Sequence, residues 1–199
     1  VQARVSRLHE PNALLAEVTT TREGAHLFLF PFEGRRVHEG LAAVLALRLG
    51  RREPGSFTYA VADHGLTLLA ARDYPFGELL TPELFDPAGL ENDLREAINL
   101  GEAAGRRFRD VAQVGGLVFQ GYPGSRKTGR QLQMSTGTLY GAFRRYDPEH
   151  PLLRQAEREV LEDQLESPRL TRALTRLASL PLHLETPRRV GPLAFPLLV

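Results

Sequence analysis

Cysteine and tryptophan are both absent from the 199 residues, and methionine occurs once. Without cysteine the chain can form neither disulfides nor thiolate zinc sites. The six histidines are scattered, and no two have the i, i+4 spacing of a helical metal site. No apolar run reaches the roughly 18 residues of a membrane-spanning helix, and no charged-then-apolar leader is visible. We therefore expect no metal site, no membrane span and no secretory signal.

Lysine is also scarce, because Lys127 is the one lysine among 25 basic residues. A GC-rich genome favours arginine, so this bias alone does not indicate a nucleic-acid partner. The content of 42% hydrophobic and 25% charged residues is that of an ordinary soluble globular protein. The sequence begins with Val1 and ends on the apolar residues 193–199, so we expect both ends to continue into a longer protein.

The basic residues are concentrated in one window, from Arg106 to Arg145. This window holds eight bases and one acid, Asp110, although the whole chain carries only +1. Such a patch suits a polyanionic partner. The alternative is a solvated helical face whose acids are distant in sequence and close in space, and the acidic segment 157–166 offers such acids. The bases are Arg106, Arg107, Arg109, Arg126, Lys127, Arg130, Arg144 and Arg145.

The start of the chain predicts a mixed α/β module over residues 1–85. Residues 14–21 and 25–32 are apolar and β-branched and flank the turn 22–24, so they predict a hairpin. Pro31 cannot donate a ladder hydrogen bond. The second strand therefore ends at Pro31 or lies at an edge of its sheet.

Residues 35–52 predict one amphipathic helix, because their apolar side chains recur on a single face. Pro54 and Gly55 end this helix. The segments 57–62 and 66–70 predict a second hairpin. The apolar face of the helix consists of Val37, Leu41, Val44, Leu45 and Leu49.

Residues 86–180 predict a helical module that contains the basic window. Its helices are expected at 90–98, 103–119, 127–145, from Pro151 onward, and at 167–179, with Ser167 as cap and Pro168 in the first turn. The expected inward residues of 103–119 are Phe108, Val111, Ala112, Gly115 and Val118, and those of 127–145 are Leu132, Leu139 and Phe143.

A short strand is expected at 182–186, within a C-terminal segment, 181–199, that packs back on the body. Residues 120–124 are expected to form a loop. Together these elements predict an α+β fold: a β-containing N-terminal module with one amphipathic helix, then a helical module, then the short strand.

The segment GYPGSRKT, residues 121–128, resembles the phosphate-binding loop G-x-x-x-x-G-K-T. Arg126 replaces the second glycine, and a side chain there obstructs the backbone nest that wraps nucleotide phosphates. No separate acidic strand offers a magnesium ligand. We therefore expect no nucleotide hydrolysis and no cofactor in this chain. A weaker role remains, because Arg126, Lys127 and N–H groups at a helix N-terminus suit a single phosphate.

Bases and aromatic rings alternate in the same window, which suits single-stranded nucleic acid. Arg126, Lys127 and Arg130 are expected within about one helical turn of each other. The loop residue Tyr122 is the stacking candidate, whereas Phe143 is assigned to the core. The candidate nucleic-acid-binding residues are Tyr122, Arg126, Lys127, Arg130, Gln131, Arg106, Arg107, Arg144 and Arg145.

No catalytic residue is predicted. His38 and Glu33 could form an acid–base pair, but a contact on the helix surface is the favoured interpretation. No G-x-S-x-G or comparable nucleophile motif is present.

Four long runs resemble the C-terminal region of the large helicase-related (Lhr) proteins and, more narrowly, the bacterial ligase-associated DEXH-box DNA helicases. In chain order they are HLFLFPFEGRRVHEGLAAVLALRL, GLVFQGYPGSRKTGRQLQ, FRRYDPEHPLLRQAEREVL and PLAFPLLV. The resemblance extends over almost the whole chain. It implies a domain that follows two RecA-like motor domains and a winged helix in a cytoplasmic protein.

The resemblance implies a parent that uses ATP and magnesium to move 3′-to-5′ on DNA in DNA repair. The motor motifs are missing from this chain, so the fragment itself is expected not to be an enzyme. Its expected role is an accessory one, in contact with the backbone of single-stranded DNA or of a DNA–RNA hybrid. The alternative is a structural module that braces the motor or recruits a repair partner.

Overall fold

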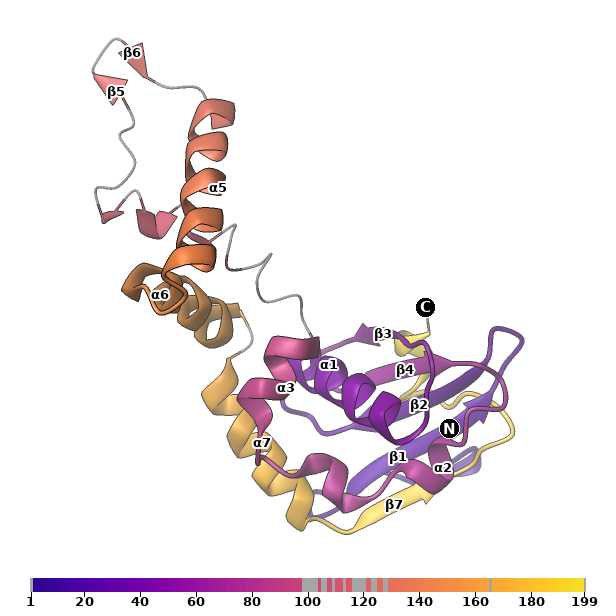
Figure 1. Ribbon diagram of the computed structural model, residues 1–199. Coiled ribbons are helices and arrows are strands. Elements are labelled where there is room, and N and C mark those ends of the chain that lie inside the picture. Colours follow the sequence, from indigo (N-terminus) through magenta and orange to yellow (C-terminus); the bar gives the residue numbers. More distant parts are fainter. Residues whose placement is uncertain are drawn as a thin grey trace. The chain divides into compact units, whose positions relative to one another are not determined.

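The computed structural model describes residues 2–97, 104, 107–108, 110–112, 114–115, 121–122, 125–126, 129–164 and 166–198, with the backbone alone at 121–122, 125–126, 129–135 and 163–164 (Figure 1). The chain forms two compact units. Unit 1 comprises Val1–Ala97 and Leu165–Val199, and unit 2 comprises Ile98–Gln164. The predicted α+β class is confirmed, because unit 1 contains a mixed sheet with helices and unit 2 is mainly helical.

The sheet of unit 1 has five strands in the order β3-β4-β2-β1-β7. Neighbouring strands run antiparallel except β1 and β7, which run parallel. Both predicted hairpins are confirmed, and β2 ends directly before Pro31 in the interior of the sheet. The strands are β1 (Leu14–Thr20), β2 (Ala25–Phe30), β3 (Thr58–Val61), β4 (Leu66–Ala70) and β7 (Leu182–Glu185).

All six residues of β2 are buried because both faces of the sheet are covered. On one face Phe28 and Phe30 pack with Ala194 and Leu197 of the C-terminal segment. That segment includes a short 3-10 helix, η4 (Phe195–Leu197), and another, η1 (Gln2–Arg4), lies near the N-terminus. Successive strand residues face opposite sides, so the intervening leucines of β2 point toward the other face.

Helix α1 (Arg35–Arg52) covers that second face and has the predicted bounds (Figure 1). The five apolar positions of the predicted face are all buried. Burial extends past that face to His38, Ala42 and Ala43, because α1 lies between β3 and β4 of the sheet and the helices α3 and α7.

The boundaries of the two units differ from those of the expected modules. Unit 1 also contains α2 (Phe76–Leu79), the 3-10 helix η2 (Pro82–Phe85), α3 (Leu90–Ala97) and α7 (Ser167–Ser179). Helix α3 packs against α1, and α7 packs against both α1 and η2. Their apolar faces are buried by the N-terminal module, which is why residues 86–97 and 165–180 belong to it.

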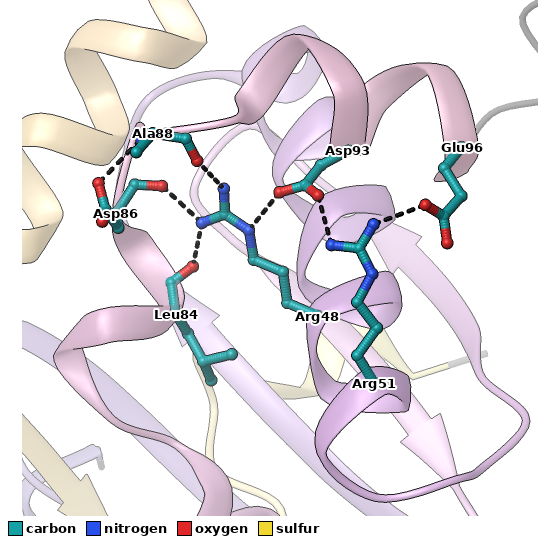
Figure 2. A network of polar contacts seen from close by, with 7 residues as sticks. All are labelled: Arg48, Arg51, Leu84, Asp86, Ala88, Asp93 and Glu96. Carbon is teal, nitrogen blue, oxygen red and sulfur yellow. Dashed lines mark hydrogen bonds and ion pairs between the residues drawn. The ribbon is translucent and has the colours of Figure 1, made fainter.

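A nearly buried ion pair joins α1 to α3 (Figure 2). The Nε of Arg48 lies 2.8 Å from Oδ2 of Asp93, and only 10% and 9% of these side chains are exposed. Arg48 also donates to the carbonyl oxygens of Leu84 and Asp86, each at 2.6 Å. The second oxygen of Asp93 accepts from Arg51 at 2.6 Å. One carboxylate and one guanidinium thereby join α1, the end of η2 and α3.

Unit 2 has its own apolar core, formed by Ala104, Phe108, Val111, Ala112, Leu153 and Ala156. The predicted inward residues Leu139 and Phe143 pack against it. Gly115 is exposed, so its predicted burial is wrong. It lies in a turn, at the end of the described part of the helix expected at 103–119. Val118 lies outside the described residues, and the side chain of Leu132 is not described.

The elements of unit 2 whose bounds are described are β5 (Gly121–Tyr122), β6 (Ser125–Arg126), α5 (Gly129–Tyr146), α6 (Pro151–Glu159) and the π-helical turn Val160–Gln164. The expected loop at 120–124 instead contains β5, which pairs with β6. Helix α7 also differs in its start. Ser167 is its first residue, and the cap position is Glu166, with a φ of 45° and no capping side-chain bond.

Candidate nucleic-acid interface

The predicted binding residues all belong to unit 2, and the structure describes three of their side chains: Arg107, Arg144 and Arg145. The backbone alone is described for Tyr122, Arg126, Arg130 and Gln131. Arg106 and Lys127 lie outside the described residues.

The segment that resembles a phosphate-binding loop contains a β-hairpin. Gly121 pairs with Arg126, and Tyr122 pairs with Ser125, in antiparallel register. Helix α5 begins at Gly129, two residues later than expected. Arg126 is therefore a strand residue, and the expectation that it shares a helical turn with Arg130 is wrong. Antiparallel pairing holds this backbone in a different path from the open nest that wraps phosphates.

The last turn of α5 carries two exposed arginines, Arg144 and Arg145. The guanidinium carbon of Arg144 lies 5.8 Å from the ring centre of Tyr140, and that of Arg145 lies 5.5 Å from the ring centre of Tyr146. Cation–π contacts of this kind orient a guanidinium and leave its N–H groups available. Neither arginine forms an ion pair with any carboxylate that the structure describes. Their position at the helix C-terminus is favourable by itself, because cations interact well with that end of the helix dipole.

The outward face of α5 is open at two glycines, Gly137 and Gly141. Apart from the neighbouring backbone of α5 itself, a Cβ built on either would meet no atom of the described residues within 4 Å. They lie one helical turn apart, opposite Leu139 and Phe143, which face the core. The glycines therefore form a smooth strip of backbone that ends near Arg144. Their spacing relative to the apolar residues is the signal in the sequence that indicates this outward face.

Arg107 has acidic partners. Its Nε lies 2.6 Å from Oε2 of Glu159 on α6, and its Nη1 lies 3.7 Å from Oδ2 of Asp110. The pKa of Glu159 is lowered, first by a hydrogen bond from Gln155 and then by Arg107. For this arginine the alternative interpretation holds, because an acid of segment 157–166 neutralises it. The same segment leaves Arg144 and Arg145 without an ion pair among the described residues.

Tyr140 lies between the core of unit 2 and Arg144. Its ring packs 5.4 Å from that of Phe108. Burial raises the pKa of its hydroxyl, and Glu157 adds to the rise while Arg144 opposes it. The phenol is therefore neutral at physiological pH, and its ring face orients Arg144.

His38 is neither an acid–base partner of Glu33 nor a surface residue. It is fully buried. Its Nε2 accepts from the backbone N–H of Glu33 at 3.1 Å, so its Nδ1 donates to the carbonyl oxygen of Ala62 at 2.6 Å. Both ring nitrogens are thus used to hold the start of α1 against the sheet. Among the described residues no group of His, Asp and Glu side chains could hold a metal ion, and no helix is long and apolar enough to cross a membrane.

The family described as DEAD/H associated matches residues 8–194. The chain belongs to this family. The match extends over both units, from the segment before β1 to the segment before η4, so it is not confined to one of them.

Known relatives of this DEAD/H-associated chain are helicases. It is 29% identical over 165 residues to the ATP-dependent helicase Lhr-Core protein 2 of Thermococcus barophilus, covering 83% of the chain and 19% of that protein. It is 27% identical over 162 residues to the ATP-dependent helicase Lhr-Core of Methanothermobacter thermautotrophicus, covering 81% and 19%. The chain thus spans about a fifth of the length of these relatives. The predicted kinship with Lhr proteins is confirmed, and the narrower resemblance to ligase-associated helicases stays a prediction.

A solved structure has the same fold. The helicase Lhr of Mycobacterium smegmatis, bound to single-stranded DNA and AMP-PNP, matches with a TM-score of 0.73 and 22% identity. The match covers 100% of this chain and 26% of the other. The fold of the two units is therefore one that occurs as part of a longer helicase chain.

Proposed function

We propose that this chain is an accessory domain of an ATP-dependent DNA helicase and contacts the backbone of single-stranded DNA through α5. Its family and its relatives, which are named as ATP-dependent helicases, support the helicase context. The solved Lhr structure with single-stranded DNA supports the choice of ligand.

The observation that carries the proposal is the combination of cations and open backbone on one helix. Arg144 and Arg145 are exposed and have no ion pair among the described residues. The glycines 137 and 141 let a phosphate approach the helix more closely than any other residue would. Guanidinium groups bind phosphate through paired N–H donors and neutralise its charge.

The remaining candidates extend this surface in the proposal. Arg130 lies 14 residues before Arg144 on α5, which is about 21 Å and close to four helical turns. A strand that follows the helix would pass both positions. Gln131 lies in the same first turn, and Tyr122, Arg126 and Lys127 belong to the segment that leads into it.

The parent protein in this proposal moves 3′-to-5′ along DNA and acts in repair, in the bacterial cytoplasm. Its RecA-like motor domains bind ATP and magnesium, and the motor and winged-helix domains are the partners of this chain. The fragment contributes DNA contact and no hydrolysis. A DNA–RNA hybrid is a second substrate that the same backbone contacts would accept.

A salt titration tests the DNA contact. Fluorescence anisotropy with a single-stranded oligonucleotide should give an affinity that falls steeply with salt. In Arg144→Ala/Arg145→Ala the negative slope of log K against log salt should become shallower by about 1.4. Each lost phosphate contact on a single strand reduces the size of this slope by about 0.7. The matched control is Arg154→Ala/Arg158→Ala on α6, which removes the same charge from the same unit. Equal loss in both variants would show a nonspecific charge effect, and no binding at low salt would refute the proposal for this chain.

One observation favours a structural role instead. Two exposed glycines one turn apart also allow another helix to pack closely, as small residues do at helix interfaces. In that case the chain would brace the motor or recruit a repair partner. Gly137→Leu would then weaken association with the rest of the parent protein and leave the salt-dependent DNA affinity of this chain unchanged.

A further inference from the structure

Phe32 in unit 1 is held in a conformation that bulky residues rarely adopt. It lies in the turn between β2 and α1 with a φ of 56°. The residue is 45% exposed, so the strain does not serve to bury it in the core. A glycine would adopt this φ without strain, but the sequence has phenylalanine at this position.

Three side chains, two from α7 and one from α1, fix the turn on both sides of Phe32. Arg176 donates to the carbonyl oxygen of Pro31 at 2.8 Å and to Oε1 of Glu33 at 2.9 Å. Arg169 donates to the carbonyl oxygen of Glu33 at 2.7 Å. His38 accepts from the N–H of Glu33 at 3.1 Å. Strained residues persist where their surroundings over-determine them, and they occur preferentially at binding sites.

Two imidazole rings lie beside the exposed phenyl ring. The ring centre of His9 is 4.2 Å from that of Phe32, and that of His64 is 6.3 Å away. Burial, and then the charge of Arg176, lower the pKa of His9, so its ring is neutral at physiological pH. His64 is positioned by a 2.9 Å hydrogen bond between its Nε2 and the carbonyl oxygen of Leu193. The ring of His9 is tilted by 37° to that of Phe32, so it packs against the phenyl ring and supports it.

Helix α7 adds positive charge next to this surface. Its outward row consists of Arg169, Arg172 and Arg176, spaced i, i+3 and i+7, and no acid occurs within Ser167–Ser179. The first and the third hold the turn. Arg172 lies between them on the helix, is exposed, and has no ion pair within the described part of the chain.

We propose that Phe32, supported by His9, stacks on a base of a single-stranded nucleic acid whose phosphate Arg172 contacts. The proposal rests on the function proposed above, since it adds a second contact, on unit 1, for the same kind of strand. An aromatic face beside an uncompensated arginine is the combination that binds single strands without reading their sequence. A protein partner with an apolar side chain would find charged and imidazole groups around Phe32, so the surroundings favour a base with its phosphate.

Comparison of a normal and an abasic strand isolates the stacking. The full chain is titrated by anisotropy with a 12-mer of deoxyadenosine and with a 12-mer of the same length and charge that lacks bases. The variant is Phe32→Gly, because glycine adopts a φ of 56° freely and keeps the turn. The matched control is Tyr59→Ala on β3, which removes the ring of a residue that is 44% exposed.

The wild type should prefer the strand with bases. Phe32→Gly should bind the deoxyadenosine strand about tenfold more weakly, as expected for one lost stack, and bind the abasic strand unchanged. Phe32→Trp should restore the preference, Tyr59→Ala should behave as wild type, and Arg172→Ala should weaken both strands in a salt-dependent way.

Several outcomes would overturn the stacking. It is wrong if Phe32→Gly binds both strands as the wild type does, which would leave the exposed ring for a protein partner, or if it loses affinity for both strands equally. These results are independent of the Arg144 and Arg145 variants, so failure of the stack and failure of the α5 contact are distinguishable. Absence of any strand binding by the wild type would overturn both.

Discussion

At the scale of single residues, Asp93 has the largest expected effect on stability. Its carboxylate joins Arg48 and Arg51, and removing it leaves Arg48 nearly buried without a counter-charge. Breaking a buried pair in this way costs about 3–5 kcal/mol. We expect Asp93→Ala to lower the free energy of unfolding by about 3 kcal/mol, measured by urea denaturation.

Glu96 provides the control for Asp93. It contacts Arg51 at 2.6 Å, but both side chains are about half exposed. Exposed pairs contribute about 0–1 kcal/mol, so Glu96→Ala should lower the free energy of unfolding by less than about 1 kcal/mol. Equal effects of the two substitutions would contradict the importance given to burial.

His38 predicts a pH dependence of stability. Burial lowers its pKa from the ordinary value of 6.5, although the hydrogen bond to Ala62 and nearby acids oppose the shift. The unfolded chain therefore binds a proton more readily than the folded one. Stability should be highest above pH 6.5 and fall as the pH drops below that value. Denaturation at pH 7.5 and 5.5 should show this fall, and His38→Gln should show a smaller one. An unchanged fall in His38→Gln would assign it to other groups, such as His9 and His26, whose pKa values burial also lowers.

At the scale of secondary-structure elements, two glycines in open space should respond to substitution in opposite directions. Gly137 lies inside α5, whereas Gly89 precedes α3 with a φ of 74°. Alanine is the better helix former by about 1 kcal/mol, so Gly137→Ala should raise the stability of unit 2. Gly89→Ala should lower that of unit 1 by about 1–2 kcal/mol, because alanine resists the left-handed conformation. Thermal unfolding followed by circular dichroism measures both.

The function proposed for α5 adds a second readout to Gly137. A methyl group there should weaken binding to single-stranded DNA while it stabilises the helix. A variant that is more stable and binds equally well would mean that phosphates do not approach the helix at this position.

At the scale of the whole molecule, unit 2 is an insertion between α3 and α7 of unit 1. The five-stranded sheet, α1, α3 and α7 all belong to unit 1. We expect that replacing residues 98–164 with a flexible linker leaves unit 1 folded, with one cooperative unfolding transition. Unit 2 has 10 bases and 8 acids, whereas unit 1 has 15 bases and 16 acids. The shortened chain therefore loses the unit with the excess of bases, and with it the salt-dependent DNA binding of α5. Loss of the cooperative transition would show that unit 1 requires unit 2.

The predictability of the fold followed the range of the interactions involved. The bounds of α1 and the β1–β2 hairpin were predicted closely, because periodicity, turn residues and Pro31 act within a few residues. The assignment of α3 and α7 to unit 1 was not, since their apolar faces fit any core until α1 is in place. The hairpin β5–β6 was missed because two-residue strands leave no periodic pattern.

The sequence by itself determined the α+β class, most of the elements, the basic window and the kinship with Lhr proteins. Only the tertiary structure decided which bases of that window are neutralised: Arg107 meets Glu159, 52 positions away, whereas Arg144 and Arg145 meet tyrosine rings. It also revealed Phe32, whose strain depends on arginines more than a hundred residues further along the chain. Charge counts are additive along a sequence, but the compensation of a charge and the strain of a turn depend on distances in space, which folding alone sets.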